Sequence, residues 1–256
     1  MKNLITLTTD FGHSDHYTGV MKGVILRINP AAKIVDITHD IEAYNGVEAA
    51  FRLMTFYSYF PEGTVHVVVV DPGVGGERKP IAVEAGGYFF VGPDNGVFSL
   101  IYENNKTRKI IEITNPKYTL RSVSDTFHGR DIFAPAAAYI SSGLKIRKLG
   151  REVSSPEMLN IHKTSIEDNE ISGEIIYSDH FGNLVTNIPG KLLDKGSVVY
   201  FGRARIDRIS KSYSGAGKGR LLAIIGSSGF LEISVNQGSA RDYFKLKRPS
   251  VRVIRG

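Results

Sequence analysis

The sequence predicts an α/β protein in which an N-terminal domain with a mainly parallel sheet precedes a smaller all-β domain. Strand and helix patterns alternate up to residue 70, and the four consecutive valines 67–70 indicate a strand that is buried on both faces. Beyond residue 170, short apolar runs are separated by glycines. This succession favours one α/β domain followed by a compact sandwich or barrel.

The first domain is expected to open with a βαβαβ unit and right-handed crossovers. Its predicted strands are 4–8, 33–37 and 64–70, and its predicted helices are 19–29 and 45–59. Asn45 is suited to cap the second helix. Residues 81–85 and 88–91 should form a hairpin around Gly86-Gly87, and 134–141 a short helix with Pro135 in its first turn.

The predicted boundary divides the chain into residues 1–165 and 166–256. Between 150 and 170 the sequence is polar and irregular, as connections between domains usually are. The strand candidates that follow are 173–177, 197–201, 221–225, 230–235 and 250–254.

Composition narrows the class of protein. With 256 residues and 42% hydrophobic content, the chain can bury a sizeable core, which excludes a disordered protein. The absence of cysteine excludes disulfides and thiolate metal sites and fits a cytoplasmic location. No stretch is apolar enough for a signal peptide or a membrane span, so no membrane association is expected.

A net charge of +6 raises the possibility of nucleic-acid binding. The densest basic stretch is the tail, where basic and apolar residues alternate. The basic residues there are Arg241, Lys245, Lys247, Arg248, Arg252 and Arg255. Such alternation is typical of the solvated face of a terminal strand, and we therefore expect no nucleic-acid partner.

Two acids follow predicted strands directly. Asp71 ends the valine strand and precedes a Pro-Gly-rich loop that brings Arg78 within reach, and Asp10 follows the first strand. Since ligands of parallel sheets bind beyond the carboxyl ends of strands, the two acids should border one crevice. The Asp10 carboxylate is suited to accept hydrogen bonds from the hydroxyls of a ribose. For both acids, ordinary turn or helix-capping chemistry is the alternative.

Three further motifs are each ambiguous by themselves. His128 lies in a tight loop before the short helix and has no evident local partner in the sequence. The turn Asp179-His180-Phe181-Gly182-Asn183 could stack on and read a flat ring, or could simply be a turn. Residues 226–233 place small donors before a strand, which suits a carboxylate ligand or a hairpin. The loop 73–79 lacks the ending of a triphosphate-binding loop, and no common metal pattern is present.

Taken in order, these motifs resemble one family over nearly the whole chain, the S-adenosylmethionine hydroxide adenosyltransferases, or S-adenosylmethionine hydrolases. The motifs are Thr8-Thr9-Asp10-Phe11-Gly12 with Asp15-His16-Tyr17, Lys22-Gly23, Val70-Asp71-Pro72-Gly73-Val74-Gly75, Phe127-His128-Gly129-Arg130-Asp131, Asp179-His180-Phe181-Gly182-Asn183 and Asn236-Gln237-Gly238-Ser239-Ala240. The family is similar to the fluorinases and chlorinases. The resemblance implies a C-terminal β-barrel, hydrolysis of this small-molecule substrate to adenosine and methionine, and no cofactor or metal. It also implies a homotrimer with sites at subunit interfaces.

The resemblance also implies roles for individual residues. Asp71, Arg78 and His128 match the catalytic set. Matches in the substrate site are Asp10 for the ribose, Tyr44 against the adenosyl group, Phe181 and Asn183 for the base, and Ser227 near the methionine carboxylate. Asp179 and Glu232 complete the expected binding residues.

Three positions depart from the halogenases. Ser228 stands where they carry an arginine, Asp71 replaces a tyrosine, and Gly129 replaces the serine that helps to hold the halide. The last two departures favour water over halide. A halide-using enzyme and a non-catalytic S-adenosylmethionine-binding protein remain the alternatives.

Overall fold

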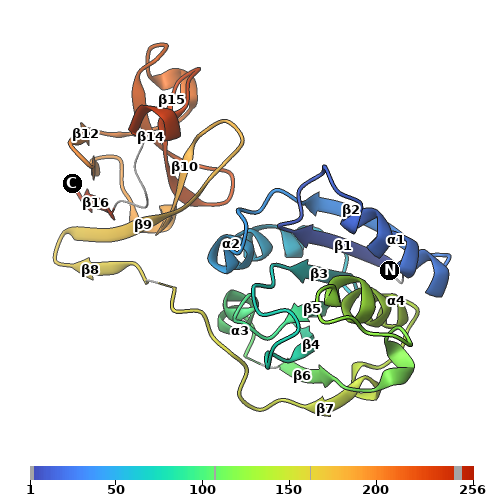
Figure 1. The fold of residues 1–256 in the computed structure, drawn as a ribbon. Coiled ribbons are helices and arrows are strands. Elements are labelled where there is room, and N and C mark those ends of the chain that lie inside the picture. The colour runs from blue at the N-terminus through green and yellow to red at the C-terminus, as the bar shows by residue number, and fades with distance from the viewer. Residues whose placement is uncertain (1–2, 107, 162, 245–249) are drawn as a thin grey trace. The chain divides into compact units, whose positions relative to one another are not determined.

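The computed structural model describes residues 3–106, 108–161, 163–244 and 250–256. The chain divides into two compact units, the first ending at Leu159 and the second beginning at Asn160. The boundary predicted after residue 165 falls just inside the second unit. Each unit has its own sheet and its own hydrophobic core (Figure 1).

The first unit is built on a seven-stranded sheet with the order β2-β1-β3-β5-β4-β6-β7. Its strands are β1 (Leu4–Thr9), β2 (Lys33–Thr38), β3 (Val65–Val69), β4 (Pro80–Ala85), β5 (Tyr88–Pro93), β6 (Arg108–Ile113) and β7 (Gly150–Glu152). The pairings among β2, β1, β3 and β5 are parallel, whereas β4, β6 and β7 extend the sheet with antiparallel pairings. The expected βαβαβ unit and the hairpin at Gly86-Gly87 are both confirmed.

Helices cover both faces of this sheet. They are α1 (Tyr17–Ile28), α2 (Gly46–Phe56), α3 (Ser99–Asn104) and α4 (Ala134–Ser141). One core cluster joins α1 and α4 to the face that carries Val67 and Val69, and a second joins α2 and α3 to the face that carries Val68 and Val70 (Figure 1). The valine run is therefore buried on both sides, as predicted, and its carboxyl end is fixed between two helical layers.

Local signals set two of the helix boundaries. The Asn45 side chain accepts a hydrogen bond from the Glu48 amide and so caps α2. Pro135 lies in the first turn of α4, where a missing N–H leaves no bond unmade. Both helices were predicted at these positions, although a separate 3₁₀ turn at Tyr57–Tyr59 follows the end of α2.

The second unit is a single, strongly curved and nearly barrel-shaped sheet. Its strand order is β12-β11-β16-β9-β10-β15-β14-β13, with β8 beside β9, and β12 curls back to contact β14. The strands are β8 (Ser165–Glu167), β9 (Glu170–Ser178), β10 (Leu184–Pro189), β11 (Val198–Phe201), β12 (Ala204–Ile206), β13 (Ile209–Ser210), β14 (Leu221–Ile225), β15 (Phe230–Val235) and β16 (Ser250–Ile254). All five strand candidates of this region are confirmed, and the open choice between sandwich and barrel falls to the barrel-like form.

Several elements were not predicted. They are α3, β6, β7, β8, β10, β12, β13 and the short helix α5 (Ala240–Phe244). The expectation of a terminal strand was wrong for Arg241 and its neighbours, which lie in α5, and correct for β16, where Val251 and Val253 are buried on either side of exposed Arg252. The tail residues Lys245, Lys247 and Arg248 lie outside the described residues.

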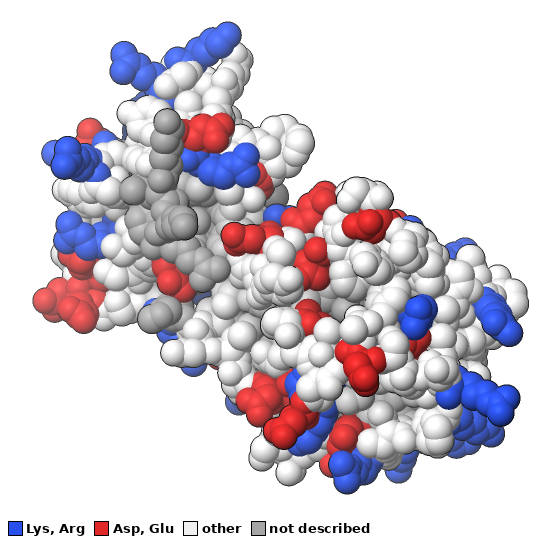
Figure 2. All heavy atoms as spheres, in the orientation of Figure 1, with Lys and Arg blue, Asp and Glu red and all other residues white. Residues whose placement is uncertain are grey.

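Charge is spread over the surface in small groups. On the face drawn in Figure 2, Lys and Arg side chains alternate with acidic ones on both units and form no continuous basic surface. Within the described ranges, no helix has the length and apolarity that a membrane span requires.

Candidate active site

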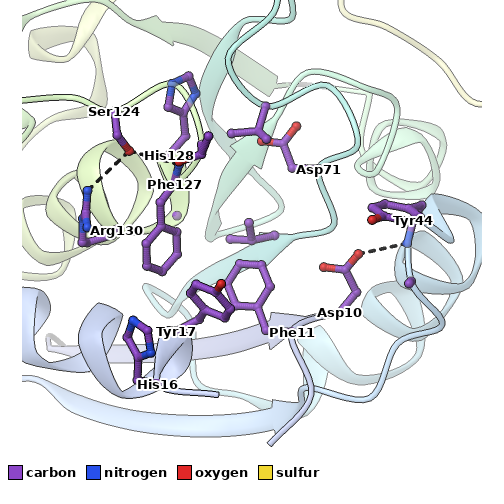
Figure 3. A pocket seen from close by; sticks show the side chains of 15 residues that line it. Asp10, Phe11, His16, Tyr17, Tyr44, Asp71, Ser124, Phe127, His128 and Arg130 are labelled. Carbon is purple, nitrogen blue, oxygen red and sulfur yellow. Dashed lines mark hydrogen bonds between the residues drawn. The ribbon is translucent and has the colours of Figure 1, made fainter. Parts of the chain in front are cut away.

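Asp10 and Asp71 lie at the same edge of the first sheet. They follow the parallel neighbours β1 and β3, whose last residues, Thr9 and Val69, are paired in register. Both acids line one cleft of about 680 Å³ in the first unit (Figure 3). The expectation that the two acids border one crevice is therefore confirmed.

Arg78 joins Asp71 to His128. Its Nε donates to Asp71 Oδ1 over 2.9 Å, and its Nη2 contacts both Asp71 Oδ2 and His128 Nδ1, the latter at 2.7 Å. Only 9% of the Arg78 side chain and 5% of the Asp71 side chain are exposed. Arg78 does not line the cleft, so it acts on the cleft through the two residues that do.

Two loops create this contact. The loop after β3 turns at Gly75, whose φ is +75°, and any Cβ there would collide with the carbonyl oxygen of Asp125. The loop after β3 thus packs directly on the segment that leads to His128. His128 itself begins a π-helical turn, Gly129–Phe133, which continues into α4. Such turns are frequent at functional sites.

The electrostatics of the cleft favour a neutral imidazole. Burial and the Arg78 guanidinium lower the pKa of His128, against the opposing influence of Asp71 and two further aspartates. Since guanidinium groups only donate, the bond to Arg78 requires a lone pair on Nδ1. The hydrogen of neutral His128 therefore resides on Nε2.

Asp10 is held by the segment that carries Tyr44. The Tyr44 amide donates to Asp10 Oδ2 over 2.9 Å, while burial raises the pKa of Asp10 despite that bond. Tyr44 has a φ of +67°, lines the cleft and is 72% exposed (Figure 3). A strained backbone with an exposed ring is typical of a ligand-binding position, because nothing in the core requires it.

Sequence reasoning missed the aromatic wall of the cleft. Phe11, Tyr17 and Phe127 lie against one another, with ring centroids 5.2–5.8 Å apart, and all three line the cleft (Figure 3). They come from three separate segments. Their signal in the sequence is that each belongs to a motif of the family resemblance, but no pattern showed that the three rings meet.

A polar cluster on the same π-helical turn was also missed. Asp131 is fully buried and accepts bonds from the Ser124 amide and hydroxyl, both at 2.8 Å, and from Arg130 Nε at 2.6 Å. Burial opposes ionisation, but the bonds from Arg130 and Ser124 lower the pKa of Asp131. Asp131 thereby fixes the segment that presents His128.

The remaining predicted residues gather in the second unit. A pocket of about 810 Å³ is lined by Asp179, Phe181, Asn183, Ser227 and Glu232. Asn183 Nδ2 donates to Asp179 Oδ2 over 2.8 Å, and the Asn183 backbone N–H donates to Asp179 Oδ1 at the same distance. The Asn183 side-chain orientation is therefore fixed, and Phe181, a residue that is 74% exposed, lines the same pocket.

Glu232 is the second buried polar residue of this second-unit pocket, after Asn183. Its Oε2 accepts a 2.9 Å bond from the hydroxyl of Tyr213, a lining residue that sequence reasoning missed. Burial raises the pKa of Glu232, and the Asp179 charge adds to this effect. Ser228, in contrast to Ser227, is absent from the lining, and its hydroxyl is buried without a hydrogen-bond partner in the described structure.

All ten predicted site residues thus fall into two groups. Asp10, Tyr44, Asp71, Arg78 and His128 meet at the first-unit cleft, whereas Asp179, Phe181, Asn183, Ser227 and Glu232 meet in the second-unit pocket.

Known proteins resemble this chain over nearly its whole length. It is 40% identical to an (R)-S-adenosyl-L-methionine hydrolase of Methanocaldococcus jannaschii, over 91% of this chain and 88% of the relative. A protein of the same name from Thermus thermophilus is 35% identical, over 93% and 94% of the two chains. A fluorinase of Nocardia brasiliensis is more distant, at 25% identity over 95% of this chain and 94% of the relative.

A solved structure and two family models support the same relationship. The crystal structure of an uncharacterized conserved protein from Thermotoga maritima matches with a TM-score of 0.92 and 39% identity, covering 98% of this chain and 100% of that one. Residues 5–150 match the N-terminal domain of the SAM hydroxide adenosyltransferases, and residues 173–251 match their C-terminal domain. The chain therefore belongs to the SAM hydroxide adenosyltransferase family.

Proposed function

We propose that this protein is an enzyme that hydrolyses S-adenosyl-L-methionine, with water attacking the ribose 5′ carbon to release adenosine and L-methionine. The observation that carries the proposal is the buried Arg78, which bonds to both Asp71 and His128 at a cleft that also presents Asp10. The names of the relatives at 40% and 35% identity support the same reaction.

Activation of water is the demanding step. The sulfonium leaves as a neutral thioether and needs no acid behind it, whereas water must be oriented and relieved of a proton. With its hydrogen on Nε2, His128 orients the water by donating to its oxygen and does not serve as the base. We assign the base to Asp71, and we assign to Arg78 the stabilisation of the hydroxide-like charge that develops.

The second-unit pocket supplies features for an adenine base. Because Asn183 donates its side-chain N–H to Asp179, its Oδ1 is left to accept a bond from a ligand. The exocyclic 6-amine of adenine is such a donor, whereas the 6-oxo group of other purines only accepts. The exposed Phe181 ring offers a stacking face next to this acceptor.

The relatives' names specify the (R) configuration at sulfur. We propose the same preference for this chain, which is tested by supplying the two separated sulfonium epimers. Faster release of adenosine from the (S) epimer would contradict it.

A halide-using reaction is the second candidate. Against it, a Cβ on Gly129 would lie only 3.2 Å from both Met21 Sδ and a ring carbon of Phe127, which leaves little room for a halide-holding serine. Formation of a halogenated adenosine from S-adenosylmethionine and chloride would favour this candidate instead.

We also propose a homotrimer in which the cleft of one subunit and the second-unit pocket of a neighbouring subunit bind one substrate, as the family resemblance implies. Each group of site residues is incomplete without the other: the first offers reaction and ribose groups, the second offers base-reading groups. A cytoplasmic location remains a prediction from the sequence.

The deciding experiment is a chromatographic product assay. Purified protein is incubated with S-adenosylmethionine in water with a metal chelator and no other reactant. Adenosine and methionine in equal amounts are expected, with one oxygen of adenosine derived from labelled water. Binding without product would indicate the non-catalytic alternative.

A further inference from the structure

Glu232 is a buried acid that has no basic partner among the described residues. The residue is 7% exposed, and its Oε2 accepts a hydrogen bond from the Tyr213 hydroxyl. Among the described residues, no Lys, Arg or His forms an ion pair with it. Buried carboxylates are ordinarily paired with a cation, since an unpaired buried charge is costly. The missing cation is therefore expected from a ligand.

The pocket around Glu232 is built for positive charge. The described residues that line it include two carboxylates, Asp179 and Glu232, and no Lys, Arg or His. Burial raises the pKa of Glu232 and the Asp179 charge adds to this effect, so a cation bound in the pocket would relieve an existing repulsion.

The local backbone accommodates the Glu232 carboxylate specifically. A Cβ at Gly226 would overlap Glu232 Oε1, so only glycine at position 226 permits this conformation. Gly226 leaves room for the carboxylate, and the Tyr213 bond holds it in place, which is the form of a preorganised recognition group.

We propose that Glu232, held by Tyr213, is the group that recognises the α-ammonium of the methionine part of the substrate and thereby selects amine-bearing sulfonium compounds. The inference rests on the proposed function and deepens it. It also accounts for Ser228, which stands where the halogenases carry an arginine. Because the described residues that line the pocket include no cation, the ionic anchor of the amino acid is its ammonium group, and its carboxylate is left to neutral donors such as Ser227.

The test compares S-adenosylmethionine with the analogue in which hydrogen replaces the α-ammonium group. Wild-type enzyme should prefer the amine-bearing compound by about 10- to 100-fold in kcat/KM, the value of one charged hydrogen bond. Glu232→Gln, which keeps the shape and removes the charge, should bring the two compounds within about threefold of each other. Tyr213→Phe should reduce the preference partially.

Ser227→Ala is the matched control from the same pocket. It should lower kcat/KM for both compounds by the same factor, because both compounds carry the carboxylate. Equal use of the two compounds by wild type, or an equal loss for both in Glu232→Gln, would overturn the inference. The wild-type comparison decides even if the variant fails to fold.

Equilibrium binding of both compounds is measured alongside turnover. A preference for the amine-bearing compound in binding without any hydrolysis would contradict the proposed function and support this site. Hydrolysis of both compounds without a preference would support the proposed function and contradict this site.

Discussion

Acid should destabilise this protein through His66, a β3 residue remote from the candidate active site. His66 is fully buried, its Nδ1 lies 2.8 Å from Thr6 Oγ1, and its Nε2 has no hydrogen-bond partner in the described structure. The surrounding rings are Phe56, Tyr57, Phe60, Tyr88 and Phe90. A second proton on the ring would find no acceptor there, and burial lowers the pKa of His66 from 6.5 to about 3.

The sign and size of the effect follow from these two pKa values. Between 6.5 and about 3 the unfolded chain binds a proton at His66 that the folded protein does not. The free energy of unfolding therefore falls as the pH drops below 6.5 and levels off near 3. Between about pH 7.5 and about pH 5, the loss from this residue is about 2 kcal/mol. That is a considerable part of an ordinary domain's stability.

His66→Phe isolates this contribution, because it keeps a ring among rings and removes the titration. Urea unfolding of both proteins is followed by circular dichroism at the two pH values. The variant is expected to be less stable at the higher pH, where the Thr6 bond is lost, and to lose about 2 kcal/mol less than wild type on acidification. Equal losses in the two proteins would refute the reasoning.

Three predictions concern the site. Asp71→Asn should reduce kcat by about 10²- to 10⁴-fold, because an amide cannot accept the proton from water; near-normal turnover in steady-state assays would sink the assignment of the base. Since neutral His128 is the competent form and its pKa lies below the ordinary value of 6.5, kcat/KM should stay level as the pH falls to about 6.5 and decline only below it; a decline centred above 6.5 in the pH profile would argue for a different group. If the sites lie between subunits, mixing the inactive Asp71→Asn protein with the inactive Asn183→Ala protein should restore activity. After random subunit exchange, about one quarter of the sites should combine two intact halves. If native mass spectrometry verifies mixed trimers and no activity returns, both groups belong to one subunit.

Much of the architecture could be predicted because its signals are local. The valine run 67–70, the Asn45 cap and the Gly86-Gly87 turn each act within a few residues of the chain, and each appears in the structure as expected. The unpredicted strands lack such signals. In β10, the consecutive residues Leu184, Val185 and Thr186 are all buried. The β10 sequence therefore does not alternate between apolar and polar residues.

Site residues could be singled out from the sequence more easily than they could be connected. The acids at positions 10 and 71 were singled out because they follow strands. Local patterns also pointed to Arg78, His128, the turn 179–183 and the segment 226–233, and the family resemblance assigned their roles and added Tyr44. The aromatic wall and Tyr213 carried no comparable signal, because a Phe or Tyr in a loop is more often packing than function. Only the cleft and pocket linings distinguish them.

The sequence by itself determined the βαβαβ order of the first 70 residues, the acid that ends the valine strand, and the family motifs, because these depend on neighbours along the chain. The tertiary structure decided which groups touch. Arg78 and His128 are 50 positions apart, and it is the packing of Gly75 against the Asp125 segment that joins them and fixes the imidazole hydrogen on Nε2. Tyr213 and Glu232 meet in the same way across a curved sheet. Hydrogen-bond geometry at 2.7–2.9 Å is set by such packing, and no pattern along the chain encodes it.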